Sequence, residues 1–116
     1  MVVFYQFDNC KGCQKVSEEL DLADKAQFRD IKNEPVSSEE LDRLQSKVGS
    51  YESLLSKKSV KFKMEGLHKQ ELTEDQYREL LLQEYTYFKR PILEIEDQVF
   101  LGSEDETIEA ARKALG

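Results

Sequence analysis

The first fifteen residues constrain the fold of this chain more than any other stretch. Residues 2–7 (VVFYQF) form an apolar run rich in β-branched and aromatic residues, which predicts a buried strand. Asp8 and Asn9 interrupt this run, since both residue types favour turns. From Cys13 onward, apolar residues recur at helical spacing. A Cys-x-x-Cys pair therefore lies where a strand ends and a helix begins.

The position of Cys10 favours a reactive thiol. It falls just before the predicted helix, near backbone N–H groups that have no helical partner and at the positive end of the helix dipole. With Lys11 and Lys15 nearby, such a position can lower a cysteine pKa from about 8.5 to roughly 3.5–7.5. A redox dithiol is the favoured interpretation for a Cys-x-x-Cys beside a βαβ pattern.

Two other interpretations of the cysteines stay open. Free cysteines are often small buried residues with no chemical role. The cysteines could also bind zinc, but a structural zinc site needs about four ligands. Besides the two cysteines, the chain has only one histidine, His68. We therefore expect no metal, and we expect His68 to be a surface residue without a catalytic role.

Length and composition set the class of protein. A chain of 116 residues can form one domain with its own core, and we expect a single domain over residues 1–116. The net charge of −7 argues against direct binding of nucleic acid, which depends on cationic side chains. Neither a membrane span nor a signal peptide is predicted. We expect a cytoplasmic monomer without a membrane partner, in a compartment where the dithiol rests reduced.

The remaining elements complete an α/β pattern. We expect a helix over residues 13–24, then a strand over residues 26–31 parallel to the first strand. A helical insert of about residues 37–84 follows, in which Ser37 with Glu40 and Thr73 with Gln76 have capping-box spacing and predict two helix starts. Residues 92–95 and 99–101 form an antiparallel hairpin, and we expect Ser103 to cap a last helix. The predicted fold is thioredoxin-like: a four-stranded mixed sheet, made of two parallel strands and the hairpin, flanked by helices. In that architecture the loop of Pro91, just before the third strand, lies beside the dithiol.

Residues 57–63 (KKSVKFK) are the most basic run of this acidic chain. They fit either a solvated loop or an edge that faces an anion.

Several stretches together resemble the arsenate reductase (ArsC)/Spx family of thioredoxin-like proteins, over essentially the whole chain. The stretches are residues 5–15, 54–58, 89–92 and 99–102. By this resemblance, Cys10 matches the catalytic cysteine of glutaredoxin-linked arsenate reductases, and Arg90 matches the arginine of their Arg-Pro motif. Lys57 and Lys58 lie where those enzymes carry another arginine, and a third arginine after the last strand is missing.

The resemblance implies three functional hypotheses. The first is a thiol-dependent, arsenate-reductase-like oxidoreductase that acts on an oxyanion or a thiol substrate. Its nucleophile is Cys10, Cys13 or glutathione is the resolving thiol, and glutaredoxin or thioredoxin is the electron donor. Arg90 completes the catalytic set, with supporting or anion-binding roles for Lys11, Lys57, Lys58 and Pro91, and no cofactor is bound.

The second and third hypotheses involve no turnover. Cys13 matches the second cysteine of Spx, a redox-switched transcription regulator that binds the α subunit of RNA polymerase. A Cys10–Cys13 disulfide would then alter a recognition surface. The third hypothesis is a non-catalytic interaction module that keeps only the fold.

Overall fold

The computed structural model describes all residues from Met1 to Gly116 and divides into two compact units. The first unit consists of Met1–Glu34 and Arg90–Gly116, and the second of Pro35–Lys89. The expected helical insert of about residues 37–84 falls within the second unit. The single-domain organisation of residues 1–116 stays a prediction.

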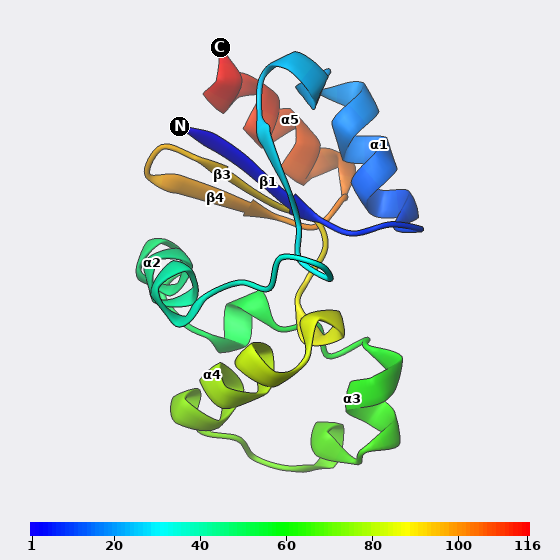
Figure 1. Cartoon of the computed structure of the whole chain (residues 1–116), viewed down its shortest axis with the longest axis vertical. Helices are drawn as coiled ribbons and strands as arrows, with labels where there is room; N and C mark the ends of the chain where they lie inside the picture. Colours follow the sequence, from blue (N-terminus) through cyan, green and yellow to red (C-terminus); the bar gives the residue numbers. More distant parts are fainter. The chain divides into compact units, whose positions relative to one another are not determined.

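The first unit contains one four-stranded sheet (Figure 1). Its strands are β1 (Val2–Gln6), β2 (Gln27–Asp30), β3 (Ile92–Ile95) and β4 (Gln98–Leu101). The order across the sheet is β2-β1-β3-β4. β1 runs parallel to β2 and antiparallel to β3, and β3 pairs with β4 as an antiparallel hairpin. The predicted mixed α/β sheet, with one parallel pair and a hairpin, is confirmed.

Two helices, α1 (Lys11–Glu19) and α5 (Asp105–Leu115), pack on one face of this sheet (Figure 1). Side chains alternate along a strand, so Phe4 and Leu93, which are paired across β1 and β3, point to the same face. There they join apolar residues of the two helices. The buried members of this core are Phe4, Cys13, Val16, Leu20, Leu22, Leu93, Ile95, Ile108 and Ala111.

The first helix differs from the prediction at both ends. It was expected over residues 13–24, but α1 spans Lys11–Glu19, and a separate 3₁₀ turn follows at Leu22–Asp24. Asp21 lies between them with a φ of 52°, in the left-handed region, which an α-helix cannot continue through. The early start matters more for function, because it makes Cys10 the residue that caps the helix.

The second unit is helical. Its helices are α2 (Ser38–Val48), α3 (Val60–Met64) and α4 (Glu74–Gln83). Reciprocal hydrogen bonds between Ser37 and Glu40, and between Thr73 and Gln76, form the two capping boxes that the sequence predicts. The basic run is not simply a solvated loop, because α3 begins within it and its Phe62 is buried, edge-to-face with Tyr87.

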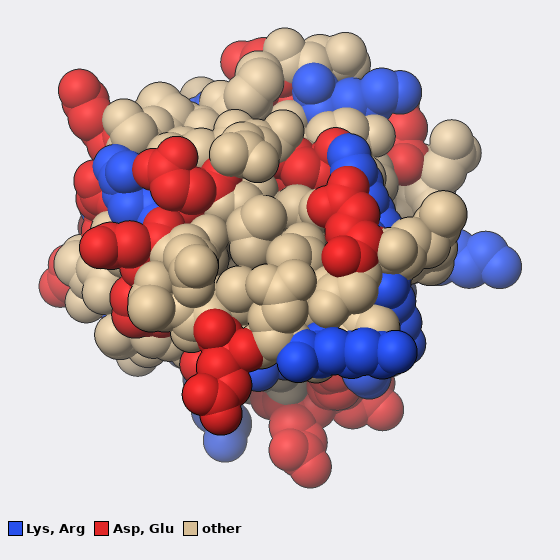
Figure 2. Space-filling model, turned by 90° about the horizontal axis from the view of Figure 1, so that it is seen from below, with Lys and Arg blue, Asp and Glu red and all other residues tan.

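The surface is mixed in charge. Seen from below the view of Figure 1, acidic and basic side chains are scattered among uncharged ones, and a small group of basic side chains lies at the lower right (Figure 2). None of the helices has both the length and the apolar character needed to cross a bilayer.

Candidate functional site

The two cysteines lie at the start of α1, where β1 has just ended. Cys10 and Cys13 are joined in a disulfide, with 5.2 Å between their Cα atoms. Cys10 is the N-cap residue of α1, and its sulfur accepts a hydrogen bond from the backbone N–H of Cys13 at 3.2 Å. The Cys10 side chain is partly exposed, whereas Cys13 is buried, with 3% of its surface accessible. A nucleophile from solvent therefore reaches Cys10 first.

The loop after β4 holds the start of α1 in place. A Cβ atom added at Gly12 would lie 2.8 Å from the Ser103 Oγ. At position 12, therefore, only glycine fits without a shift of the Ser103 side chain. The Lys15 ammonium donates to the Ser103 carbonyl at 3.2 Å and to Asp105 at 2.8 Å. The hydrogen bond to Asp105 raises the pKa of Lys15 above its usual value. Lys15 thus links α1 to α5, whereas the sequence suggested that it supports the Cys10 thiolate.

Arg90 and Pro91 lie just before β3, and the peptide bond between them is cis. The Arg90 guanidinium lies over the Phe7 ring, 4.5 Å from its centroid. Phe7 belongs to the loop that connects β1 to Cys10. The structure therefore brings the Arg90 side chain against the loop that leads to the dithiol. Lys11 is exposed in the first turn of α1.

The other two predicted anion-binding residues, Lys57 and Lys58, belong to the second unit. Lys57 forms an ion pair with Glu52 and lies over the Tyr77 ring, 6.0 Å from its centroid. The hydrogen bond to Glu52 raises the pKa of Lys57. Lys58 is exposed. Their part in the chemistry of Cys10 stays a prediction.

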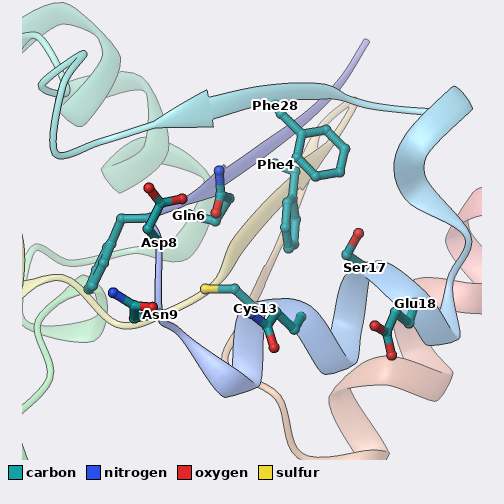
Figure 3. A pocket seen from close by; sticks show the side chains of 10 residues that line it. Phe4, Gln6, Asp8, Asn9, Cys13, Ser17, Glu18 and Phe28 are labelled. Atoms are coloured by element: carbon teal, nitrogen blue, oxygen red, sulfur yellow. The ribbon is translucent and has the colours of Figure 1, made fainter.

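A cavity of about 250 Å³ lies beside Cys13 in the first unit. Figure 3 shows the Cys13 sulfur among side chains from β1, the following loop, α1 and β2. The lining residues are Phe4, Gln6, Phe7, Asp8, Asn9, Cys13, Gln14, Ser17, Glu18 and Phe28. His68 lies on an exposed 3₁₀ turn, Leu67–Lys69, and no group of three or more histidine, cysteine or acidic residues is placed to hold a metal ion.

Sequence reasoning missed four residues of this site: Phe7, Gly12, Phe28 and Ser103. Gly12, a residue without a side chain between two cysteines, was a signal of close backbone approach that could have been used. Phe7 and Phe28 were assigned to strands or their ends, and no sequence pattern indicates that one meets Arg90 and the other lines a cavity. Ser103 was expected to cap the last helix, but Glu104 occupies the cap position of α5.

Comparisons with known proteins agree with this architecture. A solved protein from Brucella melitensis described as arsenate reductase (ArsC) related is 29% identical, with a TM-score of 0.73, 94% of this chain and 92% of that chain covered. An ArsC family related protein from Bacteroides fragilis is 25% identical, with a TM-score of 0.82 and coverage of 94% and 95%. An arsenate reductase from Vibrio cholerae, 20% identical, shares the fold with a TM-score of 0.79 and coverage of 97% and 96%.

No curated protein sequence matches the chain. The family model described as "ArsC family" matches residues 5–111, nearly the full length. This match includes both cysteines, the Arg90-Pro91 loop and all four strands but the first residues of β1. Together with the thioredoxin-like architecture of its structural neighbours, it shows that the chain belongs to the ArsC family.

Proposed function

We propose that this protein is a thiol-dependent oxidoreductase, similar to arsenate reductases, in which Cys10 is the nucleophile and Cys13 the resolving thiol. One observation carries the proposal: Cys10 caps α1, and its sulfur is both hydrogen-bonded to a helix N–H and joined to Cys13. The same N–H stabilises a Cys10 thiolate when the disulfide is reduced. A stabilised thiolate with a bonded partner three residues away is what a two-thiol reductase needs.

The chemistry balances with an oxyanion as the oxidant. The Cys10 thiolate attacks the arsenic of arsenate, and an oxygen leaves as water after protonation. The Cys13 thiolate then attacks the Cys10 sulfur, so that the sulfur–sulfur bond forms and the electron pair of the sulfur–arsenic bond stays on arsenic, which leaves as arsenite. The disulfide accounts for the two electrons that arsenate gains. Glutathione in place of Cys13 would give a mixed disulfide at Cys10 by the same step.

Arg90 supplies positive charge in this scheme. A guanidinium stays protonated at any accessible pH and offers five N–H donors, which suit an oxyanion. Its position over Phe7, beside the loop that ends at Cys10, supports a role in holding the oxyanion or the thiolate. Pro91 shapes this loop, and Lys11 adds a cation in the first turn of α1. Lys57 and Lys58 are proposed as further anion-binding residues.

Closing the cycle requires an external dithiol. Glutaredoxin or thioredoxin would attack the partly exposed Cys10 sulfur, release Cys13 as a thiolate and leave with a disulfide of its own. This electron donor and a cytoplasmic location are part of the proposal.

The test is an assay of arsenate-dependent thiol oxidation by the purified protein, supplied with glutaredoxin and glutathione or with thioredoxin. Cys10→Ser should abolish turnover. Cys13→Ser should abolish the thioredoxin-dependent activity but retain activity where glutathione resolves the intermediate. Arg90→Ala should lower kcat/KM by about 10²-fold or more, the scale at which charge-stabilising groups act, while Lys89→Ala serves as the matched control. Full activity of Cys10→Ser would contradict the proposal.

A redox-switched regulator is the second candidate, and the disulfide itself favours it. Because Cys13 is buried and bonded to Cys10, a peroxide that takes the two thiol protons and electrons as water can close the disulfide and switch the protein without an oxyanion substrate. Such a protein would bind the RNA polymerase α subunit in one redox state only. A pull-down of that subunit with oxidised and reduced protein, beside the arsenate assay, separates the two candidates.

A further inference from the structure

The cavity beside Cys13 has aromatic walls. Phe4, Phe7 and Phe28 line it, and the Phe4 and Phe28 rings meet edge-to-face with their centroids 5.1 Å apart. Phe28 is 41% exposed, although large apolar side chains are usually covered. The face of an aromatic ring carries partial negative charge and attracts cations. Because Arg90 already lies over the Phe7 ring, Phe4 and Phe28 are the walls that suit an apolar group ending in a positive charge.

The polar part of the lining has the same preference. The charged lining residues are Asp8 and Glu18, which lie at opposite ends of the lining in Figure 3, and no lysine or arginine lines the cavity. Neither carboxylate takes part in an ion pair within the chain, in contrast to Asp42, Glu52, Glu84 and Asp105, which each have a cationic partner. The remaining polar side chains are neutral. Away from Phe7, over which Arg90 lies, the charged groups of the lining are these two carboxylates, which repel an anion and attract a cation.

The place of the cavity connects it to the dithiol. Cys13, a buried member of the core of the first unit, also lines the cavity, and in Figure 3 its sulfur lies among Gln6, Asn9 and Phe4. Cys10, which is bonded to that sulfur, is the partly exposed member of the pair. A group seated in the cavity is therefore adjacent to the bond that exchanges electrons.

The volume of about 250 Å³ is smaller than the roughly 300–1,000 Å³ of sites for small-molecule ligands, and it suits a single long side chain. Glutathione carries two carboxylates and one ammonium, so its net charge is wrong for the lining. Arsenate is an anion and is excluded on the same ground.

We propose that this cavity seats a lysine or arginine side chain that neighbours the reactive cysteine of a protein partner. The inference rests on the proposed thiol chemistry and names the partner's recognition feature. With the cation in the cavity, the partner's thiolate attacks the Cys10 sulfur. A bond forms between the partner sulfur and Cys10, and the bond to Cys13 breaks with its electron pair leaving on Cys13. A second partner thiol then releases Cys10, so that the partner is oxidised and this protein reduced by two electrons.

The test measures the rate at which short dithiol peptides reduce the oxidised protein. Three peptides of the same length carry lysine, norleucine or glutamate next to the attacking cysteine. Each rate is divided by the rate with a small neutral disulfide, which removes the effect of the neighbour on the peptide's own thiol pKa. We expect lysine to exceed norleucine by about three- to tenfold, as a cation over aromatic faces and carboxylates predicts, with glutamate the slowest.

Variants identify the cavity as the source of this preference. Glu18→Gln combined with Asp8→Asn should bring the lysine and norleucine rates within about twofold. Glu19→Gln, at the neighbouring exposed position of α1 that does not line the cavity, should leave the preference intact. A lysine preference that is absent in the wild type, or unchanged in the double variant, would overturn the proposal. An equal advantage for free cysteamine over a neutral thiol of matched size would also overturn it, because the partner would then not be a protein segment.

A binding experiment separates this inference from the proposed function. The S-methylated lysine peptide cannot exchange, so NMR titration of the oxidised protein reports seating alone, and we expect shifts at the Gln14 and Phe28 amides. Binding without any exchange by the free-thiol peptides would refute the thiol chemistry and leave the cavity assignment standing. Exchange without lysine-dependent shifts would refute the cavity assignment and leave the thiol chemistry standing.

Discussion

At the scale of single residues, the site depends on where two side chains are held. Cys10 is placed by local sequence, since the end of β1 and the first turn of α1 surround it. Arg90 is far away in the sequence and reaches the same loop only because β3 pairs with β1. Its partner Phe7 provides a flat surface for the guanidinium, 4.5 Å away. The position of Cys10 at the start of α1 could therefore be predicted from the sequence, whereas the contact between Arg90 and Phe7 could not.

In the reduced protein, we expect Cys10 to titrate well below the ordinary cysteine value of about 8.5, because the Cys13 N–H and the α1 dipole favour its thiolate. The rate of alkylation against pH in Cys13→Ser measures this pKa. The same measurement in Cys10→Ser gives the alkylation rate of the buried Cys13, which should be low at every pH. Similar profiles for the two variants would remove the physical basis for Cys10 as the nucleophile.

Phe7 should act on Arg90 and not on the cysteines. Phe7→Leu removes the ring and with it a cation–π interaction of about 0.5–1 kcal/mol, so that anion binding to the reduced protein should weaken by about two- to fivefold. Phe7→Tyr keeps the ring and should bind as the wild type does. In an Arg90→Ala background, Phe7→Leu should have no further effect on anion affinity; an undiminished effect there would show that Phe7 does not work through Arg90.

At the scale of elements, capping explains which boundaries the sequence predicted well. The signal for each of two helix starts is a capping box that spans only four residues, Ser37 to Glu40 and Thr73 to Gln76. Both starts were therefore predicted correctly. The end of α1 was not, because the left-handed Asp21 has no sequence signal as strong as glycine. The contact of α1 with the loop after β4 joins distant segments and was equally invisible.

That contact makes Gly12 a test of how α1 is seated. Gly12→Ala places a methyl group 2.8 Å from the Ser103 Oγ and 3.2 Å from its Cβ, which should destabilise the oxidised protein by about 1–3 kcal/mol despite the better helix propensity of alanine. In a Ser103→Gly background the same change should cost little or stabilise. Urea unfolding of the four proteins provides the comparison, and an equal loss in both backgrounds would contradict the packing.

Helices α2 and α4 are joined by an acid-sensitive contact. Asp42 accepts hydrogen bonds from Arg78 at 2.8 and 3.1 Å and from the Tyr51 hydroxyl at 2.6 Å. These bonds, first of all those from Arg78, lower the pKa of Asp42 to about 2. A pKa that is lower in the folded state contributes stability above the unfolded value of about 3.9, and this contribution is lost as pH falls toward 2.

Unfolding free energies measured from pH 6 to pH 2 should therefore fall less steeply in Asp42→Asn than in the wild type. Glu71→Gln, at an exposed loop position, should reproduce the wild-type slope. Parallel curves for Asp42→Asn and the wild type would show that the contact does not hold in solution.

At the scale of the whole molecule, the sheet is assembled from both ends of the chain. β1 and β2 precede the second unit, and β3 and β4 follow it. Once these four strands have paired, both ends of the Pro35–Lys89 segment are fixed. Fixing the ends reduces the entropy that this segment loses on folding. The sequence indicated this order through strand patterns and the Arg90-Pro91 boundary, and the predicted helical insert of about residues 37–84 falls within the second unit. The contacts that make each unit compact are long-range, and local patterns do not contain them.

Because the strands on either side of the second unit pair in one sheet, we predict that the two units unfold together. Hydrogen exchange should give the most protected amides of β1 and of α4 the same free energy of opening, and both values should fall equally in a variant that weakens only the first unit, such as Gly12→Ala. Loss of protection confined to the first unit would show that the single-domain prediction is wrong.

The late position of β3 also has a consequence for synthesis. The ribosome produces β1 and the two cysteines first, but β3, which lies next to β1 in the sheet, emerges about 90 residues later. At about 5–20 residues per second, the nascent dithiol waits roughly 5–20 s before the sheet that buries Cys13 can form. Throughout that interval neither thiol has its folded environment. We therefore expect newly made chains to form wrong disulfides more readily than the folded protein.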